Sequence, residues 1–288
     1  MFVKTNTVKA IIDYYHESLN LTYTTTEIEV LLEIVFEYFL KFNKLDLRSK
    51  QANHLSESEL LDFHFTLKRL KQKEPIQYIL GESPFMGMMF KIDKHVLIPR
   101  PETEELVDWI INSIGSESKI LDIGTGSGCI PLALKKLNSN FDISAIDVDP
   151  NTIKVAENNA NNLKLSVDFH CVDVLSLKSI KSINEKQFDC IVSNPPYIGH
   201  SEKLQMDKSV VDFEPHLALF VDDEDPMIFY KRITQLAIEH LPKDGHLFFE
   251  SNQRYCDEVA AIMAMVGFSN IEIKKDINNN PRMIHGIR

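Results

Sequence analysis

The stretch of sequence that decides the fold is Leu121-Asp122-Ile123-Gly124-Thr125-Gly126-Ser127-Gly128-Cys129-Ile130. A short apolar run typical of a buried strand, Ile120–Ile123, leads into it, and an apolar pattern with helical spacing, Ile130–Leu137, follows. Three glycines between a strand and a helix make a tight turn at which a ligand can approach the backbone. The stretch therefore predicts the first strand–turn–helix unit of an α/β domain.

The same alternation continues toward the C-terminus. Strand-like runs lie at Ile143–Ile146, Val167–Cys171, Cys190–Val192, His246–Glu250 and Ile271–Lys274, and helical patterns at Thr152–Leu163, Ile228–His240 and Tyr255–Val266. Such alternation predicts parallel strands that are joined by right-handed helical crossovers. In that architecture ligands bind beyond the carboxyl ends of the strands.

The residues before this domain follow two other patterns. Apolar positions recur at helical spacing in Val8–Leu19, Glu27–Phe42 and Glu57–Leu70, and Thr24 and Ser56 fit capping boxes that begin the second and third of these segments. Residues 74–101 are rich in proline and glycine, which is typical of a linker with a hairpin-like extension, and Thr103–Ile114 is again helical. We therefore predict a helical domain (residues 1–73), a linker with a hairpin (74–101) and an α/β domain (102–288).

Composition excludes several classes of protein. The chain has 288 residues, of which 44% are hydrophobic and 25% charged, as in an ordinary globular protein. Its formal net charge is -11, so it lacks the basic excess of proteins that bind phosphate backbones, and it has no apolar run long enough to span a membrane. The four cysteines form no close pair that would indicate a zinc site. We expect a cytoplasmic protein that binds no metal, no membrane and, directly, no nucleic acid.

The spacing of the glycines predicts the type of cofactor. A dinucleotide fingerprint that starts at Gly124 needs a glycine at position 129, where Cys129 stands, and one that starts at Gly126 needs a glycine where Pro131 stands. The spacing is instead G-x-G-x-G, which suits S-adenosylmethionine better than a pyrophosphate.

Carboxylates follow the next two predicted strands. Asp147 could accept hydrogen bonds from both ribose hydroxyls of the cofactor, and Asp173 could accept from the adenine amino group while the Val174 N–H donates to the ring. Each of these features alone could equally be a helix cap or an ordinary turn. Three of them on successive strand ends favour a cofactor site, whose residues would be Gly124, Thr125, Gly126, Ser127, Gly128, Asp147, Asp173, Val174 and Asn194.

The most specific motif, Asn194-Pro195-Pro196-Tyr197, directly follows the next strand. An amide nitrogen is a poor nucleophile, because its lone pair is delocalised into the carbonyl. The Asn194 side-chain oxygen and the Pro195 carbonyl could accept its N–H groups and hold it facing a methyl sulfonium, while the prolines keep the turn rigid. Tyr197 could stack on the planar group. We therefore predict catalytic roles for Asn194, Pro195 and Tyr197 and substrate binding by the whole motif, Pro196 included.

The chain resembles the HemK-type protein-glutamine methyltransferases of peptide-chain release factors. The likeness is strongest in Glu74–Ile76, Leu97–Glu104 (Leu-Ile-Pro-Arg-Pro-Glu-Thr-Glu), Gly124–Gly128 and Asn194–Tyr197. It implies a seven-stranded, Rossmann-like class I methyltransferase sheet, preceded by a helical domain and a hairpin.

The same resemblance implies an activity. It is methyl transfer from S-adenosylmethionine to the glutamine side chain in the release factor's Gly-Gly-Gln loop, with S-adenosylhomocysteine as product. The helical domain would recognise the release factor, and Phe213-Glu214-Pro215 matches a family segment that could wall the pocket. The family's usual glycine near Asn279 is missing.

Two other functions and one residue stay open. An adenine-N6 or other nucleic-acid base methyltransferase would use the same motif on a flipped base, but a basic patch and a large target-reading insertion are missing. A catalytically silent cofactor-binding adaptor would have no reason to keep Asn194–Tyr197 intact. Arg100 is either a solvated linker residue or the partner of a carboxylate near the cofactor entrance.

Overall fold

The structure is a computed structural model that describes residues 5–176 and 187–288. The chain forms two compact units. The first comprises residues 1–81 and 208–213, and the second residues 82–207 and 214–288. Within the part of the chain that the structure describes, no helix is long and apolar enough to cross a membrane.

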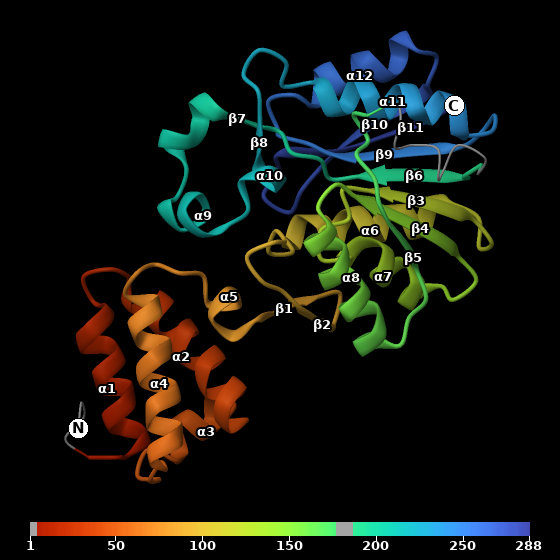
Figure 1. Cartoon of the computed structure of the whole chain (residues 1–288). Helices are drawn as coiled ribbons and strands as arrows, with labels where there is room; N and C mark the ends of the chain where they lie inside the picture. Colours follow the sequence, from red (N-terminus) through yellow and green to blue (C-terminus); the bar gives the residue numbers. More distant parts are fainter. Residues whose placement is uncertain (1–4, 177–186) are drawn as a thin grey trace. The chain divides into compact units, whose positions relative to one another are not determined.

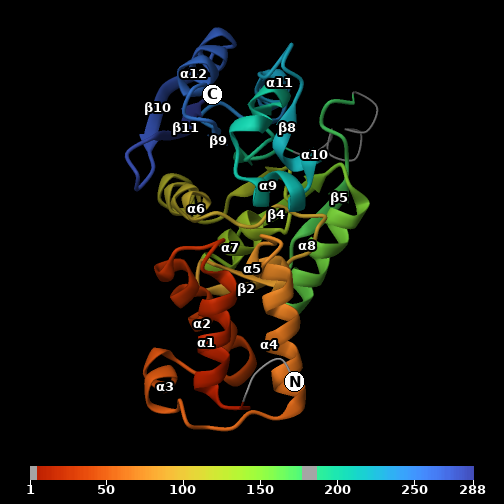
Figure 2. The ribbon, with the colours of Figure 1, turned by 90° about the vertical axis from the view of Figure 1, so that its left-hand side faces the viewer.

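The first unit is a bundle of helices. Helices α1 (Val8–Leu19), α2 (Thr25–Leu40) and α4 (Glu57–Leu70) lie side by side (Figures 1 and 2), and the short helices α3 (Lys44–Ser49), α5 (Ile76–Leu80) and α9 (Lys208–Phe213) belong to the same unit. Tyr15, Phe36 and Phe63 are fully buried where the apolar faces of the three long helices meet. The three predicted helices are confirmed.

Both predicted capping boxes are present. The Thr24 hydroxyl accepts a hydrogen bond from the Glu27 N–H, and the Glu27 carboxylate accepts from the Thr24 N–H at 2.7 Å. Ser56 and Glu59 make the same reciprocal pair at the start of α4. These pairs satisfy backbone donors that the first turn of a helix leaves without a partner, which fixes where α2 and α4 begin.

The second unit contains a seven-stranded sheet. Its strands are β3 (Lys119–Ile123), β4 (Asp142–Asp147), β5 (Asp168–Cys171), β6 (Cys190–Ser193), β9 (His246–Glu250), β10 (Ser269–Lys275) and β11 (Pro281–Ile287), in the order β10-β11-β9-β6-β3-β4-β5. Neighbours from β9 to β5 are parallel, whereas β11 is antiparallel to both β9 and β10. The runs that were predicted as strands did not include β11, which enters the sheet antiparallel to its neighbours. Only a short turn joins β10 to β11, and a parallel connection needs a much longer crossover.

Helices cover both faces of this sheet. In Figure 1, α6 (Pro101–Ser113), α7 (Cys129–Leu137) and α8 (Pro150–Leu163) lie on one face, and α11 (Ile228–His240) and α12 (Cys256–Met265) on the other. Smaller elements are the antiparallel hairpin of β1 (Glu82–Phe85) and β2 (Met88–Lys91), the strand pair β7 (Ile198–Gly199) and β8 (Phe220–Val221), the 3₁₀ helix η2 (His200–Gln205), and α10 (His216–Leu219). The predicted hairpin is confirmed.

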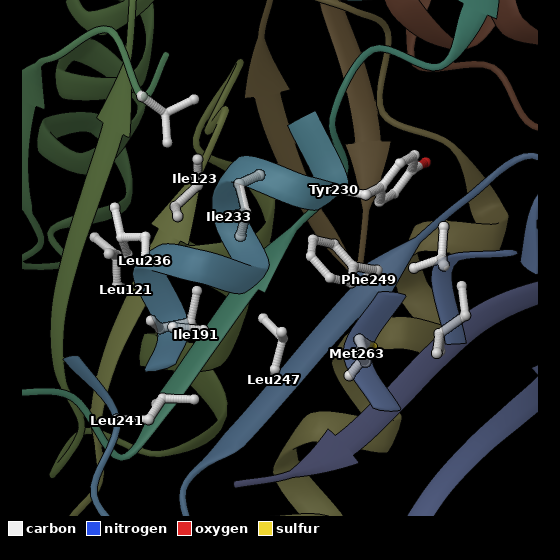
Figure 3. Close-up of a cluster of buried hydrophobic side chains, with 14 of the residues drawn as sticks. Leu121, Ile123, Ile191, Tyr230, Ile233, Leu236, Leu241, Leu247, Phe249 and Met263 are labelled. Carbon is white, nitrogen blue, oxygen red and sulfur yellow. The ribbon is translucent and has the colours of Figure 1, made fainter. Parts of the chain in front are cut away.

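The core under α11 holds the strand ends in place. Figure 3 shows Tyr230, Ile233 and Leu236 of α11 facing side chains of β3, β6 and β9, all in one buried cluster. Burying one such large apolar side chain contributes about 1.5–3 kcal/mol. The carboxyl ends of these parallel strands are therefore rigidly placed relative to one another.

The hairpin is tied to the helices beside it. The Lys91 N–H donates to the Asn159 side-chain oxygen at 2.7 Å, and the Asn159 amide donates back to the Lys91 carbonyl at 2.9 Å. The Met86 N–H donates to the Glu104 carboxylate at 2.6 Å. These bonds attach β1 and β2 to α6 and α8, so the segment that leads to Arg100 is fixed at its start.

Candidate active site

A pocket of about 370 Å³ lies at the carboxyl ends of β3, β4 and β6. In an open α/β sheet this is the edge at which ligands bind. Its walls include these predicted site residues: Gly124, Thr125, Gly126, Ser127, Asp147, Asp173, Val174, Asn194, Pro195 and Pro196. The structure thus brings most of the predicted site together. Gly128 and Tyr197 do not line the pocket.

The glycine turn leaves open space above its backbone. The N–H groups of Gly124 and Thr125 both donate to the Ile146 carbonyl, at 2.9 and 3.0 Å, which ties the turn to the end of β4. Gly126 has a φ of 55°, a conformation that favours glycine, and a Cβ built there would have no atom within 4 Å. Gly128 differs, because a Cβ there would lie 3.2 Å from the side chains of Ala156 and Leu132. Gly128 therefore serves the close packing of α7 on α8.

Asp147 faces the turn from the end of β4. One carboxylate oxygen accepts from the Gly126 N–H at 3.0 Å and the other from the Asp149 N–H at 3.2 Å. Burial raises the pKa of Asp147, and these backbone hydrogen bonds oppose the rise. At the end of the next strand, the Asp173 carboxylate accepts from the Leu175 N–H at 2.9 Å. Both acids are therefore held by backbone donors, as acceptors for a ligand need to be.

Asp122 is a second buried acid beneath the turn, and the sequence analysis gave it no role. Its side chain is fully buried, and neither carboxyl oxygen has a hydrogen-bond partner of good geometry among the residues that the structure describes. Burial raises the pKa of Asp122 to about 7, the nearby Thr125 hydroxyl opposes the rise, and Asp147 adds to it. A buried carboxyl without a partner favours a ligand that brings positive charge to the pocket beside it.

The Asn-Pro-Pro-Tyr motif begins where β6 ends. The Ser193 hydroxyl donates to the Ile123 carbonyl at 2.7 Å, so the ends of β6 and β3 are joined. Asn194 is half-buried on the pocket wall beside buried Pro195. Tyr197 instead packs against the hydrophobic cluster under α11, and burial raises its pKa to about 12. Stacking of Tyr197 on a substrate stays a prediction.

Behind Asn194 lies a polar chain that the sequence analysis did not find. The Asn194 amide nitrogen is 3.5 Å from the Thr103 hydroxyl, and that hydroxyl donates to the Glu250 carboxylate at 2.7 Å. Burial raises the pKa of Glu250 to about 7, and the Thr103 hydrogen bond and Arg282 oppose the rise. In the sequence, Thr103 stood out only as part of the Leu97–Glu104 motif, and Glu250 only as the end of a predicted strand.

The remaining wall comes from the segment after α9. The Arg100 guanidinium donates to the Glu214 carboxylate at 2.6 Å, and the Glu214 side chain is only 1% exposed. Pro215, Leu217 and Ala218, which follow, line the pocket. Of the two interpretations of Arg100, pairing with a carboxylate near the pocket is confirmed. Of the segment Phe213-Glu214-Pro215 that was expected to wall the pocket, Pro215 lines it and Phe213 and Glu214 do not.

Across residues 5–176 and 187–288, no group of three or more His, Cys, Asp or Glu side chains could hold a metal ion. The pocket walls offer hydrogen-bond acceptors: carboxylates beside an open glycine turn, and an amide oxygen and a proline carbonyl next to them.

Comparison with known proteins identifies the same two parts of the chain. A family model described as the methyltransferase small domain matches residues 102–212, and the PrmC N-terminal domain matches residues 19–81. Among solved structures, the hMettl16 catalytic domain in complex with the MAT2A 3'UTR hairpin 1 has a TM-score of 0.62, with 16% identity and 90% of both chains covered. At that identity the likeness shows the fold alone. The predicted class I methyltransferase fold is confirmed.

Curated relatives extend over almost the whole chain. A release factor glutamine methyltransferase of Flavobacterium psychrophilum is 42% identical over 90% of this chain and 91% of its own length. One of Bacteroides thetaiotaomicron is 38% identical over 94% of this chain and 96% of its own length. Identity at this level over both units confirms the family that the motifs indicated, and the chain therefore belongs to the release factor glutamine methyltransferases.

Proposed function

We propose that this protein transfers a methyl group from S-adenosylmethionine to the side-chain amide nitrogen of the glutamine in the Gly-Gly-Gln loop of peptide-chain release factors. The observation that carries this proposal is the shared pocket. Asn194 and Pro195, the acceptors suited to an amide, line the same pocket as the glycine turn and Asp147. The release factor as substrate is inferred from the names of the relatives, and the hydrogen-bond acceptors that line the pocket suit an amide substrate.

The pocket fits S-adenosylmethionine, which supplies an electrophilic methyl group when bound. The open backbone at Gly126 would admit the methionine part, and the buried carboxyl of Asp122, which has no hydrogen-bond partner of good geometry among the described residues, would favour its positive charge. Asp147 would accept the ribose hydroxyls. Asp173 and Val174 would take the adenine, beside the apolar side chain of Phe229. S-adenosylhomocysteine would be released from the same residues.

Asn194 and Pro195 would hold the substrate glutamine. The Asn194 side-chain oxygen and the Pro195 carbonyl each accept one N–H of the glutamine amide, which points its nitrogen at the methyl group. Placement of this kind lowers the activation free energy by several kcal/mol, because the reacting groups no longer have to meet by diffusion in the right orientation. No strong base is needed, since an alkylated amide nitrogen is acidic and loses its extra proton to water.

The helical domain predicted over residues 1–73 would bind the release factor, because every group that touches the pocket lies in the second unit. Such a partner works in translation termination, so we expect the protein in the cytoplasm. Direct binding to nucleic acid or to a membrane has no part in this proposal.

The test is mass spectrometry of a release factor after incubation with the protein and S-adenosylmethionine. One added methyl on the Gly-Gly-Gln glutamine is the expected result. A release factor in which that glutamine is replaced by asparagine is the matched control and should gain none. A methyl on an added DNA or RNA and none on the release factor would reject the proposal in favour of a base methyltransferase. Cofactor binding with no methyl on either would favour a silent adaptor.

A further inference from the structure

A buried chain of polar groups connects the pocket wall to the end of β9. It runs from the Asn194 amide nitrogen to the Thr103 hydroxyl (3.5 Å) and from that hydroxyl to the Glu250 carboxylate (2.7 Å). Thr103 is 3% exposed and Glu250 is 2% exposed, so the bond between them is shielded from water, whereas the contact with Asn194 lies at the pocket wall. The three residues come from α6, β9 and the segment after β6. Such a chain transmits hydrogen-bond direction from one end to the other.

The direction follows from counting protons. An ionised Glu250 can only accept, so the single proton of the Thr103 hydroxyl must point to it. The hydroxyl then offers a lone pair to Asn194, which only the amide nitrogen of Asn194 can use. Asn194 also lies close enough to Glu250 for its amide to oppose part of the rise in the pKa of that carboxyl. The nitrogen is thus held on the Thr103 side, and the Asn194 oxygen faces the pocket.

Protonation of Glu250 would reverse this direction. A neutral carboxyl can donate to Thr103, whose proton then turns to Asn194. The Asn194 oxygen would accept that proton, and its NH₂ group would face the pocket. A donor there meets the N–H groups of the substrate glutamine, which need acceptors. Both orientations have the same shape, so the charge on Glu250 decides between them.

The surroundings of Glu250 set the pH at which that change occurs. The charged and titratable groups that face it are Arg282 from β11, Glu102 from α6, Tyr230 from α11, Cys129 from α7, and Tyr197 after β6. Burial raises the pKa of Glu250 to about 7, Thr103 and Arg282 oppose the rise, and Glu102 adds to it. The carboxyl therefore changes charge near neutral pH.

We propose that Glu250 is a positioning residue that acts through the Thr103 hydroxyl to present the oxygen of Asn194, and not its nitrogen, to the substrate amide. This inference rests on the proposed function, because it assigns Asn194 the role of acceptor for the glutamine. A purely structural Glu250 would hold α6 against β9 and would leave the pH dependence of turnover unchanged.

The test compares the full-length wild type with three variants on release factor and S-adenosylmethionine. Thr103→Val removes the hydroxyl at nearly constant shape, Thr103→Ser keeps a hydroxyl, and Glu250→Gln removes the charge. Turnover number and KM for the release factor are measured across pH, and calorimetry of cofactor binding checks that each variant keeps its pocket.

Thr103→Val should lower turnover on the order of tenfold to a hundredfold, with KM and cofactor affinity changed by no more than about twofold. Thr103→Ser should recover most of that loss. Turnover of the wild type should rise as the pH rises through about 7, and Glu250→Gln should lower turnover and abolish that rise.

The inference alone would be overturned by a wild type that methylates the glutamine while Thr103→Val turns over as fast, or by a Glu250→Gln variant with the wild-type pH profile. If serine fails to recover what valine loses, the hydroxyl is not the link, and the inference also falls. A wild type that binds the cofactor but leaves the release factor unmethylated would overturn the proposed function, and this inference with it.

Discussion

Replacing Asp122 should stabilise the folded protein at high pH but weaken cofactor binding. Burial raises the folded-state pKa of Asp122 to about 7 from an ordinary value of 3.8, so between these pH values the folded protein holds a proton that the unfolded chain has released. The stability that this acid contributes is present below about pH 4 and is lost as the pH rises through about 7. Asp122→Asn should therefore be more stable than the wild type at pH 8, on the order of a few kcal/mol, with the difference vanishing near pH 4.

Chemical denaturation at several pH values checks this, and calorimetry should show weaker cofactor binding by the same variant. Asp142→Asn is a matched control, because Asp142 is an exposed acid that begins a strand of the same sheet. An Asp122→Asn variant with the same stability gap at low and high pH would contradict the assignment of the raised pKa.

Residues that follow strand ends were predictable, and residues that act through contacts were not. Asp147 and Asn194 could be placed in one site, because parallel strands bring their carboxyl ends to one edge of the sheet. The bond between Thr103 and Glu250 joins positions 147 residues apart, and no local pattern encodes it. Gly128 and Tyr197 share motifs with pocket residues but face α8 and the core under α11. A motif therefore predicts the neighbourhood of its residues better than the direction of each side chain.

The segment that walls the pocket depends on one ion pair. Arg100 is a third exposed, whereas its partner Glu214 is buried. Among the described residues, Arg100→Ala would leave the buried Glu214 carboxylate with only the Ile98 N–H at 3.4 Å, and breaking a buried pair in this way costs about 3–5 kcal/mol. We expect lower stability, toward the smaller figure because Arg100 is partly solvated, and weaker cofactor binding as Pro215 and Leu217 lose their anchor.

Thermal unfolding and calorimetry measure both effects. The double variant Arg100→Ala/Glu214→Gln removes the unpaired charge and should regain much of the stability. Lys231→Ala is a matched control that breaks an exposed pair with Asp225 and should cost less than about 1 kcal/mol. Equal losses from Arg100→Ala and Lys231→Ala would show that burial of Glu214 is unimportant.

At the scale of elements, periodicity predicted the long helices and the parallel strands but not β11. Its sequence begins with Pro281 and Arg282 and contains Gly286, so it does not read as a strand by composition. It becomes one because the turn before it returns the chain to the open edge of β9. In that turn Asn279 has a φ of 66°, and asparagine tolerates this left-handed conformation.

At the scale of the whole molecule, the two units have separate hydrophobic cores, one built on α1, α2 and α4 and the other on the sheet with α11 and α12. A chain that begins at Glu82 therefore keeps every residue of the pocket and one complete core. We expect it to bind S-adenosylmethionine but to lose most affinity for the release factor, because residues 1–73 are proposed to recognise that partner. Calorimetry with each ligand measures both affinities. Undiminished release-factor binding would contradict the proposal that the helical domain recognises this partner.

The central claim is that Asn194 holds the substrate amide, and turnover of an Asn194→Ala variant measures it most directly. The side chain lies on the pocket wall and outside both hydrophobic cores, so the variant should fold. Asn194→Asp, which keeps an acceptor but adds a charge, should bind the cofactor and misplace the amide. The account predicts that Asn194→Ala lowers turnover on release factor about a hundredfold, with a smaller loss of S-adenosylmethionine affinity. A folded Asn194→Ala protein that methylates the release factor at nearly the wild-type rate would contradict it.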